Sequence, residues 1–144
     1  MTRLISCCVL LVLIVLSGCG SNNVGVSGKV IFSDDGSPLT CGVVHFATDT
    51  FQATGTIKED GTFVMGSFGE RDGLPVGTYQ VSILGASELL PAEKLEDEKV
   101  YSFIDPKWES PLTSDLTITI DKSTSNIVIK VDRNPITKEQ FLLQ

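Results

Sequence analysis

The chain has 144 residues, with 18 acidic and 11 basic side chains, one histidine and a formal net charge of −7 at pH 7. Such an acidic chain argues against binding to nucleic acid, because proteins that bind DNA or RNA need basic patches that displace counterions from the phosphates. The length is enough for one domain with a core of its own.

The chain begins with a pattern typical of an export signal. The basic residue Arg3 precedes an apolar run from Val9 to Leu16, and small residues stand just before Cys19. These are the parts of a secretory signal peptide. The sequence Leu16-Ser17-Gly18-Cys19 also resembles the lipobox of bacterial lipoproteins, in which the cysteine thiol receives a diacylglycerol and the leader is removed. The resemblance implies a lipoprotein signal peptide over residues 1–18, lipid attachment at Cys19 and a membrane-anchored location in the cell envelope.

A membrane-spanning helix is the alternative interpretation of this apolar segment. Leu4 to Leu16 covers 13 residues, whereas a helix needs about 20 apolar residues to cross the hydrocarbon core of a bilayer. Two acyl chains suffice for stable anchoring. We therefore expect the protein to contact the lipid bilayer through acylated Cys19, with the inner and the outer membrane both open as its location.

Cysteine usage leaves one thiol in the mature chain. Cys7 and Cys8 lie in the leader and Cys19 carries the lipid, so Cys41 has no partner for an intramolecular disulfide. A free cysteine usually behaves as a small buried hydrophobe, and we expect this of Cys41. A reactive or intermolecularly paired thiol is the alternative.

After the leader, the sequence predicts a tether and then strands. Residues 19–25 are small and polar, which is typical of a flexible tether. From Val24 onward apolar residues alternate with polar ones, as in half-buried strands. The inward side chains of the first two strands are expected to be Val24, Val26, Val30, Phe32, Val44 and Phe46. The cluster from Asp34 to Pro38 supplies the turn between these strands.

The middle of the chain predicts a hairpin, a long loop and a central strand. Asp60-Gly61 stands between the β-rich runs 55–58 and 62–65, and this is the strongest short-range hairpin signal. A glycine-rich loop from Gly66 to Pro75 follows, with a charged tip at Glu70-Arg71-Asp72. The alternating residues Tyr79, Val81 and Ile83 then predict a strand at the centre of a sheet.

The last third of the chain is less regular. Residues 87–99 are acidic and could hold a short helix, and residues 101–116 predict a long loop held down by side chains such as Tyr101, Trp108 and Leu112. Loops longer than about 15 residues are usually functional or disordered. The runs 116–120 and 127–131 predict two strands joined as a hairpin through 121–126, and the tail 133–144 is expected to form one helical turn.

About seven strands with turn signals between them predict an all-β antiparallel sandwich over residues 26–132. Several motifs occur along it in order: Val26-Ser27-Gly28-Lys29-Val30, Pro38-Leu39, the 53–57 to 60–63 hairpin, Pro75-Val76-Gly77-Thr78-Tyr79, Pro106-Lys107-Trp108 and Ser110-Pro111-Leu112-Thr113-Ser114. Together they resemble the small lipoproteins of planctomycete-type bacteria that carry a carboxypeptidase-regulatory-like, transthyretin-like domain. The resemblance implies an Ig-like, prealbumin-like sandwich of seven strands, exported and membrane-anchored, with no established catalytic activity.

No catalytic or metal-binding set is complete in the sequence. The transthyretin fold also hosts 5-hydroxyisourate hydrolase, which uses several histidines and a C-terminal Tyr-Arg-Gly-Ser, whereas this chain has His45 alone and ends in Phe-Leu-Leu-Gln. A mid-strand histidine has no nucleophile elbow beside it. Cys41 and His45 supply two of the four ligands of a structural zinc site, and Asp34-Asp35-Gly36 and the acidic run 93–98 lack the spacing of a calcium loop. We therefore predict no enzyme activity, no metal and no cofactor.

Two functions remain open at this point. The first is a structural or protein-interaction module, which would meet other envelope proteins through its sheet edges and the 86–116 segment. The alternative is a carbohydrate-binding module in which Tyr101 and Trp108 stack on sugar rings. The thin supply of aromatics in this segment favours the interaction module, and a buried indole at Trp108 would remove the sugar platform.

Overall fold

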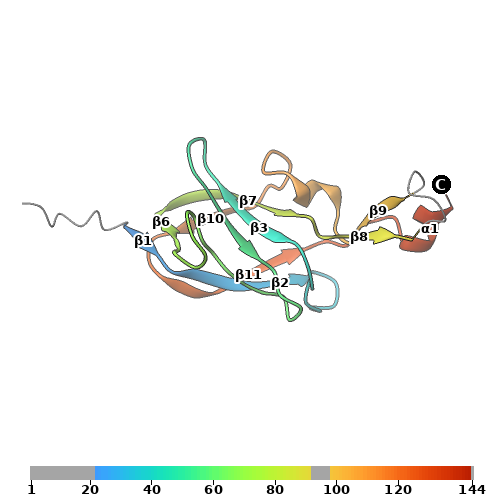
Figure 1. Ribbon diagram of the computed structural model, residues 1–144, viewed down its shortest axis with the longest axis horizontal. Helices are drawn as coiled ribbons and strands as arrows, with labels where there is room; N and C mark the ends of the chain where they lie inside the picture. Colours follow the sequence, from blue (N-terminus) through green and yellow to red (C-terminus); the bar gives the residue numbers. More distant parts are fainter. Residues whose placement is uncertain (1–21, 92–97, 144) are drawn as a thin grey trace, which may run out of the picture.

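A computed structural model describes residues 22–91 and 98–143, and they form a sandwich of two β-sheets (Figure 1). The larger sheet has the strand order β10-β7-β3-β4 and the smaller one has the order β11-β2-β5. The strands of the larger sheet are β3 (Val43–Ala47), β4 (Gln52–Thr56), β7 (Gly77–Leu84) and β10 (Thr117–Ile120). Those of the smaller sheet are β2 (Val26–Phe32), β5 (Thr62–Val64) and β11 (Thr124–Val131). The prediction of an all-β sandwich is confirmed.

The core follows the alternation that the sequence predicted. Val44 and Phe46 on β3 are fully buried, and on β7 the predicted inward residues Tyr79, Val81 and Ile83 are buried as well. The smaller sheet contributes buried side chains at Val26, Val30, Phe32, Phe63, Ile129 and Val131. β7 lies between β10 and β3, so its predicted central position is confirmed.

The predicted C-terminal hairpin is wrong. β10 pairs antiparallel with β7 in one sheet, whereas β11 pairs parallel with β2 in the other. The segment between them therefore crosses from sheet to sheet, and both strands send apolar residues into the same core from opposite sides. Among the described strands, β2 and β11 make the one parallel pair, and Gly28 lies opposite Ile127, where a side chain would collide with the β11 backbone.

The Asp60-Gly61 turn forms as predicted, but its two flanking strands belong to different sheets. Gly61 has φ +81°, and Asp60 accepts hydrogen bonds from the backbone N–H and hydroxyl of Thr62 at 3.0 and 2.6 Å. β4 pairs with β3, and β5 pairs with β2. One isolated bridge, between Thr54 and Gly66, joins the two edges. The turn is thus a corner of the sandwich.

The ends of the domain also differ from the prediction. Within the expected tether, β1 (Asn23–Val24) pairs with β6 (Leu74–Pro75). The expected helix over 87–99 is instead a hairpin of β8 (Ser87–Leu90) and β9 (Lys99–Ser102), of which residues 92–97 lie outside the described part. The expected helical turn in the tail is α1 (Lys138–Leu142). The β8–β9 hairpin and α1 lie at the end of the molecule opposite β1 (Figure 1).

Candidate functional site

The predicted lipid attachment residue, Cys19, lies outside the described residues, and so does the leader 1–18. Its acylation stays a prediction. Across 22–91 and 98–143, no helix is both long enough and apolar enough to cross a membrane.

Tyr101 is buried at the base of the β8–β9 hairpin. It is 8% exposed, its hydroxyl donates a hydrogen bond to the Ile136 carbonyl at 3.0 Å, and its ring meets Phe103 and Phe141 edge to face at 6.0 and 5.6 Å between centroids. A ring enclosed in this way has no free face for a sugar. Tyr101 instead fixes α1 to the hairpin, since Phe141 belongs to α1.

Trp108 is half-buried in the 3₁₀-helix Pro106–Glu109 and packs against the edge of the core. Its indole N–H is buried and has no hydrogen-bond partner among the described residues, although it lies close enough to Asp132 to contribute to the lowered pKa of that carboxyl. The main cause of that lowered pKa is the hydrogen bond from Lys107, whose ammonium also lies 5.2 Å from the Trp108 ring centroid. The indole is therefore engaged with the protein. Leu112, expected to anchor the same segment, is 93% exposed, and that expectation is wrong.

The remaining candidates for chemistry are also engaged in local contacts. His45 lies on the outer face of the larger sheet, with Nδ1 3.3 Å from the Ser82 hydroxyl and Nε2 3.2 Å from the Gln52 amide oxygen. A Ser-His-Asp triad needs a carboxylate where Gln52 stands. Cys41 is half-buried, and burial raises the pKa of its thiol. Such a shift disfavours the reactive thiolate.

Metal ligands do not converge either among the residues that the structure describes. Asp34 and Asp35, the acidic residues of the first turn, bind the Arg133 guanidinium at 2.8 and 2.9 Å. In the described part of the chain, no group of three or more His, Cys, Asp and Glu residues could hold a metal ion. The acidic run 93–98 falls almost wholly on residues outside that part.

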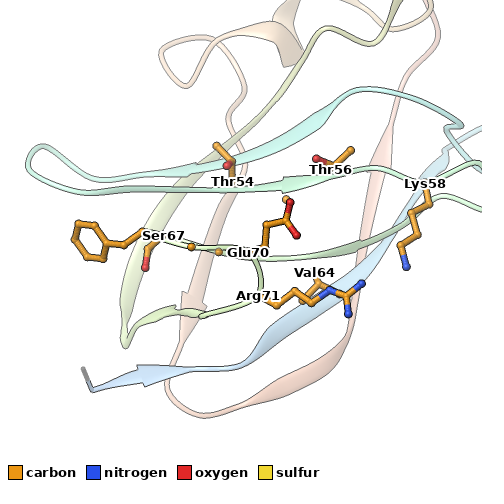
Figure 2. Close-up of a pocket in the computed structure, with 11 residues that line it drawn as sticks. Thr54, Thr56, Lys58, Val64, Ser67, Glu70 and Arg71 are labelled. Atoms are coloured by element: carbon orange, nitrogen blue, oxygen red, sulfur yellow. The ribbon is translucent and has the colours of Figure 1, made fainter. Parts of the chain in front are cut away.

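A groove of about 540 Å³ lies where β4 and β5 diverge (Figure 2). Exposed threonines of β4 form one wall, and the loop after β5 forms the other. Figure 2 shows Glu70 projecting from this loop towards the threonines, while Lys58 and Arg71 extend towards the same end of the groove. The lining residues with side chains are Thr54, Thr56, Lys58, Val64, Ser67, Phe68, Glu70 and Arg71.

The loop wall of the groove is held by Asp72. Its carboxylate accepts hydrogen bonds from the backbone N–H groups of Ser67, Phe68 and Gly69, the last two at 3.0 Å. The bond from Ser67 is the largest cause of the lowered pKa of Asp72. Gly73 closes the loop with φ +74°, where a Cβ would lie 2.2 Å from the Val24 carbonyl oxygen. The loop therefore has one defined course against β1.

Phe68 stands at the rim of the groove and is 91% exposed. Its ring meets Phe51 edge to face at 6.4 Å, and Phe51 meets the buried Tyr79 at 6.2 Å. The Tyr79 hydroxyl donates to the Pro75 carbonyl at 2.6 Å. A continuous series of aromatic contacts thus runs from the core to this exposed ring.

The sequence predicts the loop and its charged tip but not the groove. The groove depends on β4 and β5 joining different sheets, and the hairpin signal at Asp60-Gly61 predicted that they pair. The sequence feature that could have indicated the groove is the spacing of the glycines in this loop. Gly66 lacks space for a side chain, since a Cβ there would lie 2.2 Å from the Gly69 carbonyl oxygen.

Comparison with known proteins adds little to this description. No family model matches the chain, and no curated protein matches it. One solved structure with some similarity is the major pilin subunit of Bacillus cereus, at 15% identity and a TM-score of 0.41; the alignment covers 78% of this chain and 30% of the pilin chain. A similarity this low carries no conclusion about family or function. The resemblance to planctomycete-type lipoproteins gains no support from these comparisons and stays a prediction.

The described residues thus define a small all-β sandwich module with two distinctive surfaces. One is the polar groove beside β4, and the other is the end formed by the β8–β9 hairpin and α1.

Proposed function

We propose that the protein is a non-catalytic lipoprotein of the cell envelope that is tethered to a membrane through acylated Cys19. In this proposal the sandwich is a spacer and interaction module. Its distal end, defined as the β8–β9 hairpin with α1, contacts another envelope protein.

The observation that carries the proposal is an exposed apolar pair on the distal end. Leu89 on β8 and Val100 on β9 are cross-strand partners, and they are 58% and 60% exposed. The opposite face of the hairpin packs on α1 through Tyr101 and Phe141, and Lys138 of α1 pairs with Glu88 at 2.7 Å. One face of the hairpin is therefore held by its own chain, and the other presents apolar side chains to a partner.

The position of this pair supports the tether as well. A lipid on Cys19 would lie only a few residues before β1, and the distal end is at the other end of the long axis of the molecule (Figure 1). Attachment at one end leaves the other end free to reach a partner. The predicted sugar platform of Tyr101 and Trp108 gives the alternative function little support, because both rings are packed against the protein.

Lipid attachment is tested by metabolic labelling with palmitate. The Cys19→Ser variant is expected to accumulate as a full-length precursor without label, since it lacks the thiol that would be acylated. Cys41→Ser is the matched control and is expected to keep the label. Label in the Cys19 variant would contradict the anchor.

The distal contact is tested by crosslinking and capture with the intact protein solubilised in mild detergent. The double variant Leu89→Ser, Val100→Ser is expected to lose the captured envelope protein. Val128→Ser on β11 is the control, because Val128 is similarly exposed at 57% but lies on the smaller sheet of the sandwich and not on the β8–β9 hairpin. Equal capture by the double variant and the control would refute the assignment of this surface.

A further inference from the structure

We infer that the groove beside β4 is a binding site for a saccharide that carries a carboxylate. The carboxylate would lie between Lys58 and Arg71, and a sugar ring would pack against Phe68. This site is separate from the distal end and does not depend on the function proposed for that end.

Two cations define the charged end of the groove. Lys58 and Arg71 form no ion pair with any residue that the structure describes, although Lys58 lies near enough to Asp60 to contribute to the lowered pKa of that carboxyl. Both side chains extend to the same end of the groove in Figure 2. A guanidinium presents a planar set of donors that matches a carboxylate. Together the two cations favour an anion at this end of the groove, whose lining also holds one carboxylate, that of Glu70.

The rest of the groove offers the groups that recognise sugar hydroxyls. Thr54, Thr56 and Ser67 line it with hydroxyls that can both donate and accept, and Glu70 adds a carboxylate that accepts. Gly55 lies between these threonines on the buried face of β4 and lets β5 approach closely at the base of the groove; a Cβ there would lie 2.8 Å from the Val64 carbonyl oxygen. Few polar groups converging on a preformed concave surface are typical of small-ligand sites.

The loop that carries Phe68 and Arg71 is preorganised. Arg71 has φ +65°, and no other non-glycine residue in the described part of the chain has a positive φ. A bulky side chain persists in this conformation only where its surroundings impose it, and such residues cluster at binding sites. Asp72 imposes it here through its bonds to the loop backbone. Phe68 is therefore presented to solvent by an ordered loop and not by a fraying one.

The same geometry disfavours an extended peptide as the ligand. A peptide that adds to a sheet needs free main-chain donors and acceptors on an edge strand. The outward groups of Thr54 on β4 already bond to Gly66, with N···O distances of 2.9 and 2.8 Å in the two directions. A sugar needs no such edge, because its hydroxyls pair with side chains.

The test is calorimetric titration of the intact, detergent-solubilised protein at low salt with three probes. They are a trigalacturonate, a neutral galactose trisaccharide and a triglutamate peptide. We expect binding of trigalacturonate with at least about tenfold preference over the neutral sugar, and a loss of about tenfold or more in the Lys58→Gln, Arg71→Gln variant. Phe68→Ala is expected to weaken binding several-fold.

The control is the Lys122→Gln, Lys130→Gln variant, which removes two exposed cations, one in the segment between β10 and β11 and one on β11, and is expected to bind normally. Thermal melting of each variant verifies that the fold is kept. The inference is overturned if none of the probes binds, or if binding survives loss of both groove cations. It is also overturned if the peptide binds more tightly than the sugar acid and Phe68→Ala has no effect, because the ligand would then be an acidic peptide.

Discussion

The substitution Gly28→Ala tests the parallel contact between β2 and β11, which the sequence did not predict. A Cβ on residue 28 would lie 2.2 Å from the Ile127 carbonyl oxygen and 2.9 Å from the Ile127 Cβ. Such contacts are essentially never closer than 3.0 Å. The obstructing atoms belong to the backbone of a paired strand, so β11 must shift by about 1 Å and its ladder with β2 must loosen.

The expected cost is about 2–3 kcal/mol, at the upper end of the usual range for overpacking, because backbone cannot move aside as a side chain can. This is a large share of a total stability of about 5–15 kcal/mol. Urea unfolding followed by circular dichroism measures it, and the midpoint should fall by about 1–2 M.

Gly25→Ala is the matched control for this experiment. A Cβ at that position meets its nearest atom, the Ser123 hydroxyl oxygen, at 4.0 Å, so there is space for a methyl group. We expect its free energy of unfolding to stay within about 0.5 kcal/mol of that of the unmodified protein. Equal midpoints for the two variants would show that β11 does not lie against Gly28 in this register.

Three further predictions concern acid stability, the C-terminal helix and the groove. Hydrogen bonds from Ser37, with a smaller contribution from Arg133, lower the pKa of Asp35 to about 2. Its stabilising contribution is therefore present above about pH 4 and is lost as the pH falls towards 2; a melting temperature that stays constant over this range would contradict it. Phe141→Ala removes the ring that packs on Tyr101. A five-residue helix cannot persist alone, so hydrogen exchange should show loss of protection in α1 while global unfolding changes little. Arg71→Gly relieves a disfavoured φ and should raise stability by about 0.5–1 kcal/mol in urea unfolding; a lower midpoint would refute the strain at this position.

Where apolar and polar residues alternate, the sequence by itself determined where a strand lies and which of its side chains point inward. Period-two alternation is a local property of the chain, so it located β2, β3 and β7 and their buried residues Val30, Phe46 and Tyr79 before any partner was known. The turn at Asp60-Gly61 was equally local, since it depends on a glycine with positive φ and an adjacent carboxylate.

Strand partners could not be predicted in the same way. Alternation specifies the two faces of a strand but not its neighbours, because pairing depends on contacts between residues far apart in the chain. The parallel pairing of β11 with β2 and the separation of β4 from β5 are of this kind. The β8–β9 hairpin is another case, since its buried residues Leu90 and Tyr101 come from opposite sides of an acidic segment.

Both candidate surfaces were decided by the tertiary structure for the same reason. Lys58 and Arg71 lie 13 positions apart and reach one groove because β4 and β5 diverge at a corner of the sandwich. Tyr101 was expected as an anchor of its segment, with a sugar-stacking ring as the alternative, and it is buried because the tail packs Phe141, 40 positions later, against it. Whether a side chain is exposed depends on which segments pack on it, and segments far apart in the sequence pack together only when the chain folds.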